Sequence, residues 1–245
     1  MTGTLITVAP APLAASTPDD PAALAGLVAG ARDCQALGAR VLRLRHDGDP
    51  ARCGDLIRAL AEQTELMVQV DGALAVEAGA ELGGIPMSGS AGAIGAAHTR
   101  LRDAAVAAVY QVTAVEQLAA VADLLSSAGL PFGAVHVALQ LDESAGPAAV
   151  VAAAAALAEL PPGAILSAVG VGVTALPVLM TALATGGHLC VGTADTPFYA
   201  PDLRAESDMQ LVARAVGFAR LAQRPPLTNA EARALLGVPA RVSTH

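Results

Sequence analysis

The sequence contains no lysine, because all 14 of its basic residues are arginine. Schiff-base catalysis and lysine-anchored pyridoxal phosphate both require a side-chain amine, so the sequence excludes both. It also excludes a P-loop, whose lysine contacts the nucleotide phosphates. The chemistry of this chain must therefore depend on other groups.

Aromatic residues and long apolar runs are also scarce. Aromatic side chains make up 2% of the chain, the arginines are scattered and the formal charge is −8, so we expect no nucleic-acid surface. Mean hydropathy is +0.54, yet no uninterrupted apolar run of about 18 residues occurs, so we expect no membrane span. The alanine-rich segment 147–160 is instead typical of a soluble helix.

Cysteine is limited to three distant residues, Cys34, Cys53 and Cys190. Their odd number and wide spacing fit neither a zinc knuckle nor a disulfide framework. No basic residue precedes the apolar part of residues 1–15, so we expect no secretory signal. Together these features predict a reducing, cytoplasmic setting.

Short strands and helices alternate along the chain. We expect strands over 5–8, 41–44, 66–70, 85–87, 104–110, 135–141, 165–169 and 189–191. Helices are expected over 21–37, 50–63, 114–128, 147–160, 176–184, 207–223 and 229–236. This alternation predicts a parallel sheet. A single (β/α)8 barrel domain over 1–245 fits best, with an open doubly wound sheet as the alternative.

The segment 71–101 gives a weaker signal, because it is rich in glycine and alanine. Its stretch Ser88-Gly89-Ser90-Ala91-Gly92 could suggest a phosphate loop, but it lacks the glycine spacing of a dinucleotide fingerprint. We therefore expect a plain flexible loop there.

The segment 186–195 is expected to form a short strand followed by a polar residue, Asp195. A glycine pair ends the preceding helix, an apolar strand follows, and Asp195 comes just after the strand's carboxyl end. Barrels place their catalytic groups at that end, so Asp195 is a candidate base or cation-orienting group. A role in a turn or helix cap beside Pro197 is the alternative.

Arg43 and Arg45 end the second expected strand and should share one face of it. Two guanidinium groups at a barrel mouth could bind a carboxylate or a phosphate. The alternative is that they pair with Asp195 or Asp71, or line a solvated rim.

The histidines do not have the spacing of a metal site. His46 follows Arg45, and His98 lies apart from the other histidines. We expect His136 and His188 to be hydrogen-bonded structural groups. Cys190 is expected to be a small, inert core residue, with a position facing the barrel interior as the alternative.

Several segments of the chain resemble the sequence motifs of a known enzyme family. Residues 166–173 (LSAVGVGV), Leu176-Pro177 and residues 186–195 (GGHLCVGTAD) resemble the β-keto acid cleavage enzymes. Residues 5–9 and 206–238 are similar to that family's beginning and ending, whereas the resemblance is thin over 71–134, which is shortened relative to the family.

The resemblance implies a TIM barrel, a homo-oligomer and a reaction with acetyl-CoA that yields acetoacetate and a new CoA ester. It also implies a divalent metal, generally zinc, held by two histidines after the second strand and a glutamate near the last strand. A small anionic carboxylate or a CoA thioester is then the expected ligand. In this sequence the candidate ligand-binding residues are Arg43, Arg45, Ser167 and Cys190, and the candidate catalytic residue is Asp195.

The sequence departs from the family pattern at the metal positions. Arg43 and Arg45 stand where the histidines are expected, and Ala194 stands where the glutamate is expected. Cys190 replaces an arginine, and the segment 10–12 (PAP) lacks the carboxylate expected after the first strand. Arginine has no lone pair for a metal, so we expect no bound zinc. Three interpretations follow: a divergent metal-independent enzyme, an anion binder, or an inactive partner of an intact homologue.

Overall fold

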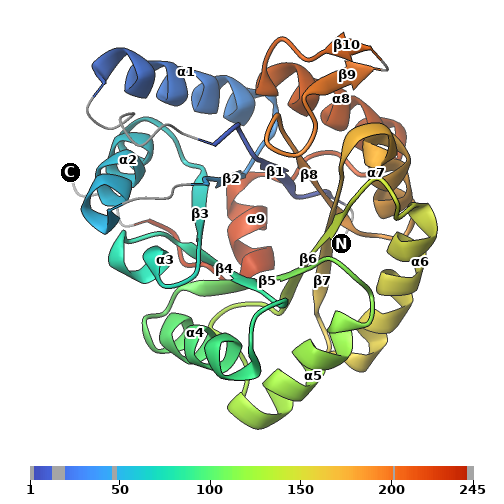
Figure 1. The fold of residues 1–245 in the computed structure, drawn as a ribbon. Helices are drawn as coiled ribbons and strands as arrows, with labels where there is room; N and C mark the ends of the chain where they lie inside the picture. The colour runs from blue at the N-terminus through green and yellow to red at the C-terminus, as the bar shows by residue number, and fades with distance from the viewer. Residues whose placement is uncertain (1–2, 13–19, 46–48, 201, 242–245) are drawn as a thin grey trace.

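The computed structural model describes residues 3–12, 20–45, 49–200 and 202–241. His46 and Asp47 lie outside these ranges. Eight parallel strands pair in chain order and close into a barrel, so the (β/α)8 prediction is confirmed (Figure 1). The strands are β1 (Ile6–Val8), β2 (Val41–Arg43), β3 (Met67–Asp71), β4 (Leu82–Pro86), β5 (Ala107–Val112), β6 (His136–Leu141), β7 (Ile165–Gly170) and β8 (His188–Val191).

Helices surround the barrel on its outer side (Figure 1). They are α1 (Pro21–Leu37), α2 (Pro50–Gln63), α3 (Leu74–Glu77), α4 (Ala91–Asp103), α5 (Gln117–Ala128), α6 (Pro147–Ala156), α7 (Ala175–Ala184) and α8 (Asp208–Leu221). A ninth helix, α9 (Asn229–Leu236), follows them. Within the described residues no helix is both long enough and apolar enough to cross a membrane.

Local sequence signals explain where several helices begin. The Asp20 and Asp49 side chains accept backbone N–H bonds at the starts of α1 and α2, and a proline follows each aspartate. At α9, Thr228 and Glu231 form a capping box, in which each side chain bonds the other residue's backbone. These caps satisfy N–H groups that have no partner within the helix.

The barrel interior is filled from its amino-terminal end. Inward-facing residues at the starts of the strands pack with apolar residues of α9 and its flanks. This cluster includes Leu5 just before β1, then Val41, Met67, Leu82, Ala107 and Ile165 from the strands, and Leu227, Leu235, Leu236 and Val238 from the C-terminal segment. Because side chains alternate along a strand, Val41 inside implies that Arg43 also faces inside, nearer the opposite end.

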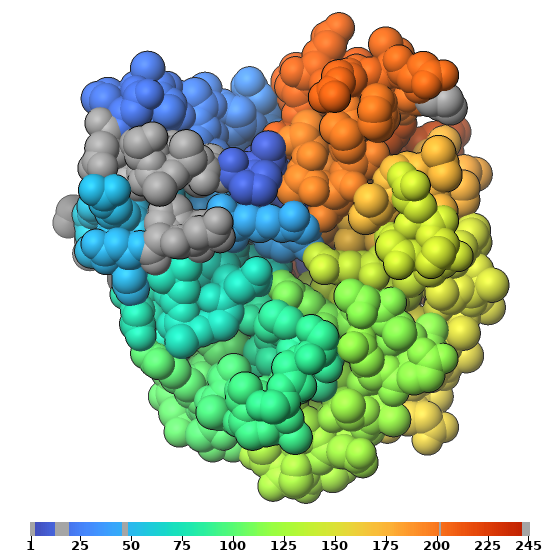
Figure 2. Space-filling model, in the orientation of Figure 1, coloured from blue at the N-terminus to red at the C-terminus, as the bar shows by residue number. Residues whose placement is uncertain are grey.

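Besides the short helix α3, two features differ from the sequence-based expectations. The stretch 88–92 is a loop only up to Ser90, because the Ser90 hydroxyl accepts the Ala93 N–H and α4 begins at Ala91. The composition concealed this helix, since glycine and alanine give little amphipathic contrast. The other feature is an antiparallel hairpin, β9 (Phe198–Ala200) and β10 (Leu203–Arg204), which no pattern predicted. In Figure 2 the blue α1 lies at the upper left of the view and this orange hairpin at the upper right.

Candidate functional site

The candidate site lies at the carboxyl ends of the barrel strands. Arg43 is the last residue of β2, Cys190 lies in β8, and Asp195 follows β8 in the loop toward α8. The strands β2 and β8 both pair with β1, so these residues approach each other across the first strand. This is the end at which barrel enzymes carry their chemistry.

Arg43 and Asp195 form a buried ion pair. Arg43 Nη2 donates to Asp195 Oδ1 at 2.6 Å and to Oδ2 at 2.8 Å, and the two side chains are only 4% and 3% exposed. Burial opposes the charge of Arg43, but nearby acidic groups, Cys190 and Asp195 among them, hold its pKa above the ordinary value. Arg43 therefore stays positively charged although it is buried, and the carboxylate of Asp195 stabilises that charge.

Arg45 joins the same carboxylate from a more open position. Its Nη2 donates to Asp195 Oδ1 at 3.1 Å, and its side chain is 39% exposed. The predicted alternative in which both arginines pair with Asp195 is thus observed. Two cations and one anion leave this trio with one net positive charge, and Arg45 is the member that solvent reaches.

Cys190 lies beside the trio but is not poised to react. Its Sγ is 3.9 Å from Asp195 Oδ2, and the residue is buried. Burial raises the pKa of its thiol to about 12, so it is uncharged at neutral pH. It packs with Ala9, Val169 and Ala194 in a small apolar cluster, which agrees with a core role.

Asp71 and Gln111 form a second polar contact, on the strands β3 and β5. Gln111 Nε2 donates to Asp71 Oδ1 at 2.6 Å. A side chain at Gly84 on the intervening β4 would collide with both groups, so this glycine makes room for their contact. Asp71 also raises the pKa of Arg43, although it is not hydrogen-bonded to it. The alternation of side chains along β5 could have predicted that Gln111 faces the barrel interior. A single glutamine gave no further reason to assign it to the site.

Ser167 lies deeper in the barrel than the arginine pair. Its hydroxyl is 2.7 Å from His136 Nε2, and both residues are nearly fully buried. His188 Nδ1 accepts the Leu5 N–H at 3.0 Å, so both histidines are hydrogen-bonded as predicted. Burial, and after it the charge of His188, lowers the pKa of His136 to about 3. Burial, and after it the charge of Arg224, lowers the pKa of His188 to about 4. No contact joins Ser167 to Arg43 or Arg45 in the described chain.

The loop between β8 and α8 is fixed by two further contacts. Thr193 donates its N–H and its hydroxyl to Asp208 Oδ1, at 2.7 and 2.9 Å. Gly192 passes close to the backbone of Ala9, with a φ of +155°. These contacts hold the segment that carries Asp195 against β1.

The side chains at the mouth determine whether a metal ion could be held there. Among the described residues, no group of three or more histidine, cysteine, aspartate or glutamate side chains is placed to hold a metal ion. At the mouth, both oxygens of the Asp195 carboxylate already accept bonds from guanidinium groups. Such a carboxylate is better suited to orient the arginines than to accept a proton.

Solved structures with a similar fold include an oxaloacetate complex of ObcA, with a TM-score of 0.73 and 11% identity over 88% of this chain. A ternary complex of ObcA with a C4-CoA adduct and oxalate gives a TM-score of 0.72 over the same share. This chain spans 66% of the length of ObcA in both cases. The 3-hexulose-6-phosphate synthase from Salmonella typhimurium is also similar, with a TM-score of 0.60 and 14% identity over 89% of this chain and 99% of that one.

The sequence comparison is more specific than these likenesses of fold. The family model of the beta-keto acid cleavage enzymes matches residues 73–238, which is more than half of the chain. The match includes the glycine- and alanine-rich middle, where the resemblance was thin, and it ends within the segment that follows α9. This chain therefore belongs to the family of β-keto acid cleavage enzymes.

Proposed function

We propose that this family member binds a β-keto acid by its carboxylate at Arg45 and does so without zinc. The proposal rests on the charges of three residues at the barrel mouth, Arg43, Arg45 and Asp195. Asp195 neutralises the buried Arg43, whereas the half-exposed Arg45 adds a positive charge that solvent reaches. A guanidinium group in this position offers a fork of donors that suits a carboxylate.

The class of ligand is supported by the similar structures. ObcA was captured with oxaloacetate, and with oxalate together with a C4-CoA adduct. Both small ligands are carboxylates, and oxaloacetate is itself a β-keto acid. A carboxylate or a CoA thioester is therefore the proposed ligand of this chain, while its oligomeric state and its cytoplasmic location stay predictions.

The residues at the expected metal positions do not fit zinc. Arg43 and Arg45 have no lone pair to donate and would repel a cation, and Ala194 has no ligand atom. Asp195 is engaged by both guanidinium groups, so binding zinc there would cost two ion pairs. No step of the proposed chemistry is therefore assigned to a metal.

The arginine pair could supply part of what a metal supplies in such a reaction. In the family reaction, the acyl group of the β-keto acid passes to CoA, and the remaining carboxymethyl carbon joins the acetyl group to give acetoacetate. Negative charge develops on oxygen during both the cleavage and the joining of the carbon–carbon bonds. A fixed cation beside that oxygen lowers the barrier. We assign this role also to Arg45, whose guanidinium group Asp195 orients.

An inactive homologue that acts as a structural or regulatory partner is the second candidate. It is favoured by the three positions at which the resemblance implies metal ligands, since Arg43, Arg45 and Ala194 at those positions would not hold a metal that polarises the keto group. In this case the ion pair of Arg43 and Asp195 would have only a structural role, because it joins the end of β2 to the loop after β8.

An acetoacetate-release assay separates the two candidates. Purified protein is incubated with acetyl-CoA and a panel of β-keto acids, once with EDTA and once with added zinc. The proposal expects equal release in both arms and a loss of at least about tenfold in Arg45→Ala. Arg58→Ala is the matched control, because Arg58 is an exposed arginine on α2, paired only with the exposed Asp55 in the described chain. Release in the zinc arm alone would overturn the metal-free proposal, and no release in either arm would favour the inactive homologue.

A further inference from the structure

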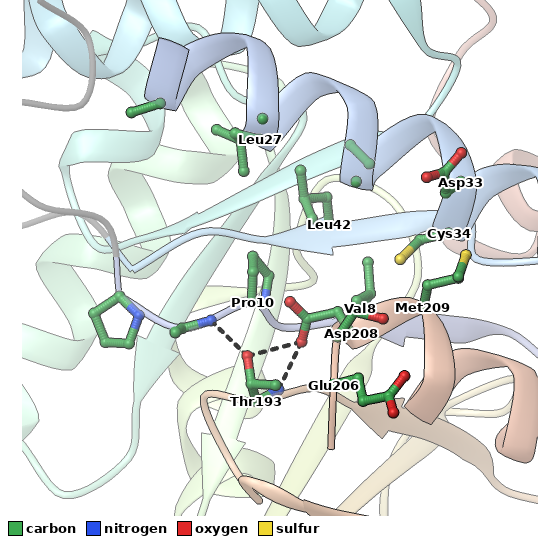
Figure 3. A pocket seen from close by; sticks show the side chains of 17 residues that line it. Val8, Pro10, Leu27, Asp33, Cys34, Leu42, Thr193, Glu206, Asp208 and Met209 are labelled. Carbon is green, nitrogen blue, oxygen red and sulfur yellow. Dashed lines mark hydrogen bonds between the residues drawn. The ribbon is translucent and has the colours of Figure 1, made fainter. Parts of the chain in front are cut away.

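A groove of about 570 Å³ lies outside the barrel, between α1 and α8 (Figure 3). Its floor is formed by Val8 of β1 and Leu42 of β2, whose side chains point away from the barrel interior. Leu27 of α1 and Met209 of α8 line its walls. The volume is typical of a site for a small organic molecule.

The groove exists because α1 presents small residues toward α8. Ala23, Gly26 and Gly30 are spaced so that they fall on one side of the helix and line the groove. A Cβ atom added at Gly26 or Gly30 would meet no other atom within 4 Å. Larger side chains would fit here without strain and would fill the space.

Carboxylates supply the charge of the groove. Asp33, Glu206 and Asp208 line it, and no arginine does so among the described residues. Asp208 is held in place because its Oδ1 accepts both bonds from Thr193 (Figure 3). The pKa of the buried Cys34 thiol is raised to about 12, first by burial and then by the charges of Asp208 and Asp33. The groove therefore has an apolar floor and a negative potential.

We propose that this groove binds an organic amine, that is, an ammonium group carried on an alkyl or aryl body. The ammonium group would lie near Asp208 and Glu206, and the apolar body would lie on Val8, Leu42 and Leu27. Charge complementarity favours a cation over an anion, and the apolar floor favours an organic cation over a metal ion. This site is separate from the arginine pair, because its floor residues face the other side of the strands.

Isothermal titration with n-hexylammonium chloride tests the proposal, with sodium hexanoate as the matched anion. We expect saturable binding of hexylammonium and none of hexanoate. Gly30→Leu should weaken hexylammonium binding at least tenfold, because the leucine occupies the groove. Gly95→Leu is the control, since Gly95 is a helical glycine of α4 that also has open space around its Cβ position, and it should bind as the wild type does.

A charge variant provides a second and independent readout. Glu206→Gln should weaken hexylammonium binding severalfold, and added salt should weaken it further. Arg45→Ala should leave this binding unchanged, so the groove and the proposed carboxylate site can fail separately. Absence of saturable hexylammonium binding, equal binding of hexanoate, or unchanged binding in Gly30→Leu would each overturn the proposal.

Discussion

Arg43 and Asp195 are 152 positions apart in the sequence, yet Arg43 Nη2 lies 2.6 Å from Asp195 Oδ1 in the buried mouth of the barrel. The bond joins the end of β2 to the loop after β8, across the intervening β1. It therefore links the beginning and the end of the barrel at the edge that carries the proposed chemistry.

Removal of one member of this pair should destabilise the protein strongly. Arg43→Met leaves a buried carboxylate with only Arg45, and Asp195→Leu leaves a buried guanidinium, so each change should cost about 3–5 kcal/mol in the free energy of unfolding. The double variant should recover much of that loss, because neither charge then remains buried. Urea denaturation followed by circular dichroism measures all three values.

The surface pair Arg58–Asp55 provides the control for that experiment. Its side chains are 69% and 60% exposed, so Arg58→Ala should change the stability by no more than about 0.5 kcal/mol. If Arg43→Met and Arg58→Ala had equal effects, the buried pair would not have the structural role described above.

Gly192 should tolerate no side chain. A Cβ atom there would lie 1.9 Å from the carbonyl oxygen of Ala9, and the φ of +155° is unfavourable for other residues. Gly192→Ala should therefore destabilise the protein by about 2–5 kcal/mol, because both strain and overlap contribute. In contrast, Gly95→Ala meets open space within a helix and should stabilise it by about 0.5–1 kcal/mol. Equal thermal midpoints for the two variants would contradict this account.

Stability should fall when the pH drops below about 6.5, because His136 and His188 are buried in the neutral form. Burial lowers the pKa of His136 to about 3 and that of His188 to about 4, below the unfolded value of 6.5. Between these values the unfolded chain binds more protons than the folded one, so acid favours unfolding. At pH 5 each histidine should cost about 2 kcal/mol relative to pH 8.

Urea denaturation at pH 8 and at pH 5 checks this prediction. The double variant His136→Leu/Ser167→Ala removes one of the two groups together with its hydrogen-bond partner, so about half of the pH-dependent loss should disappear. A pH dependence that is the same in this variant and in the wild type would show that other groups cause the acid sensitivity.

Sequence patterns were sufficient for most of the barrel and for part of the site. The periodicity of apolar residues along strands and helices is a local signal, so the expected ranges agree closely with α1, β2 and α9. The helix α4 was missed because its glycines and alanines conceal its buried face, and only Ser90 marked its start. The pairing of Arg43 with Asp195 was one of several alternatives, since a sequence shows charges but not their separation. The Asp71–Gln111 contact depends on the space above Gly84, which only the three-dimensional structure reveals.

Direct binding of a β-keto acid to metal-free protein tests the central claim most directly. Protein treated with EDTA is titrated with acetoacetate by isothermal calorimetry, alongside Arg45→Ala and Arg58→Ala. The account predicts saturable binding to the wild type and to Arg58→Ala, and binding at least about tenfold weaker for Arg45→Ala. Binding that appears only after zinc is restored, or that is equally strong in Arg45→Ala, would contradict it.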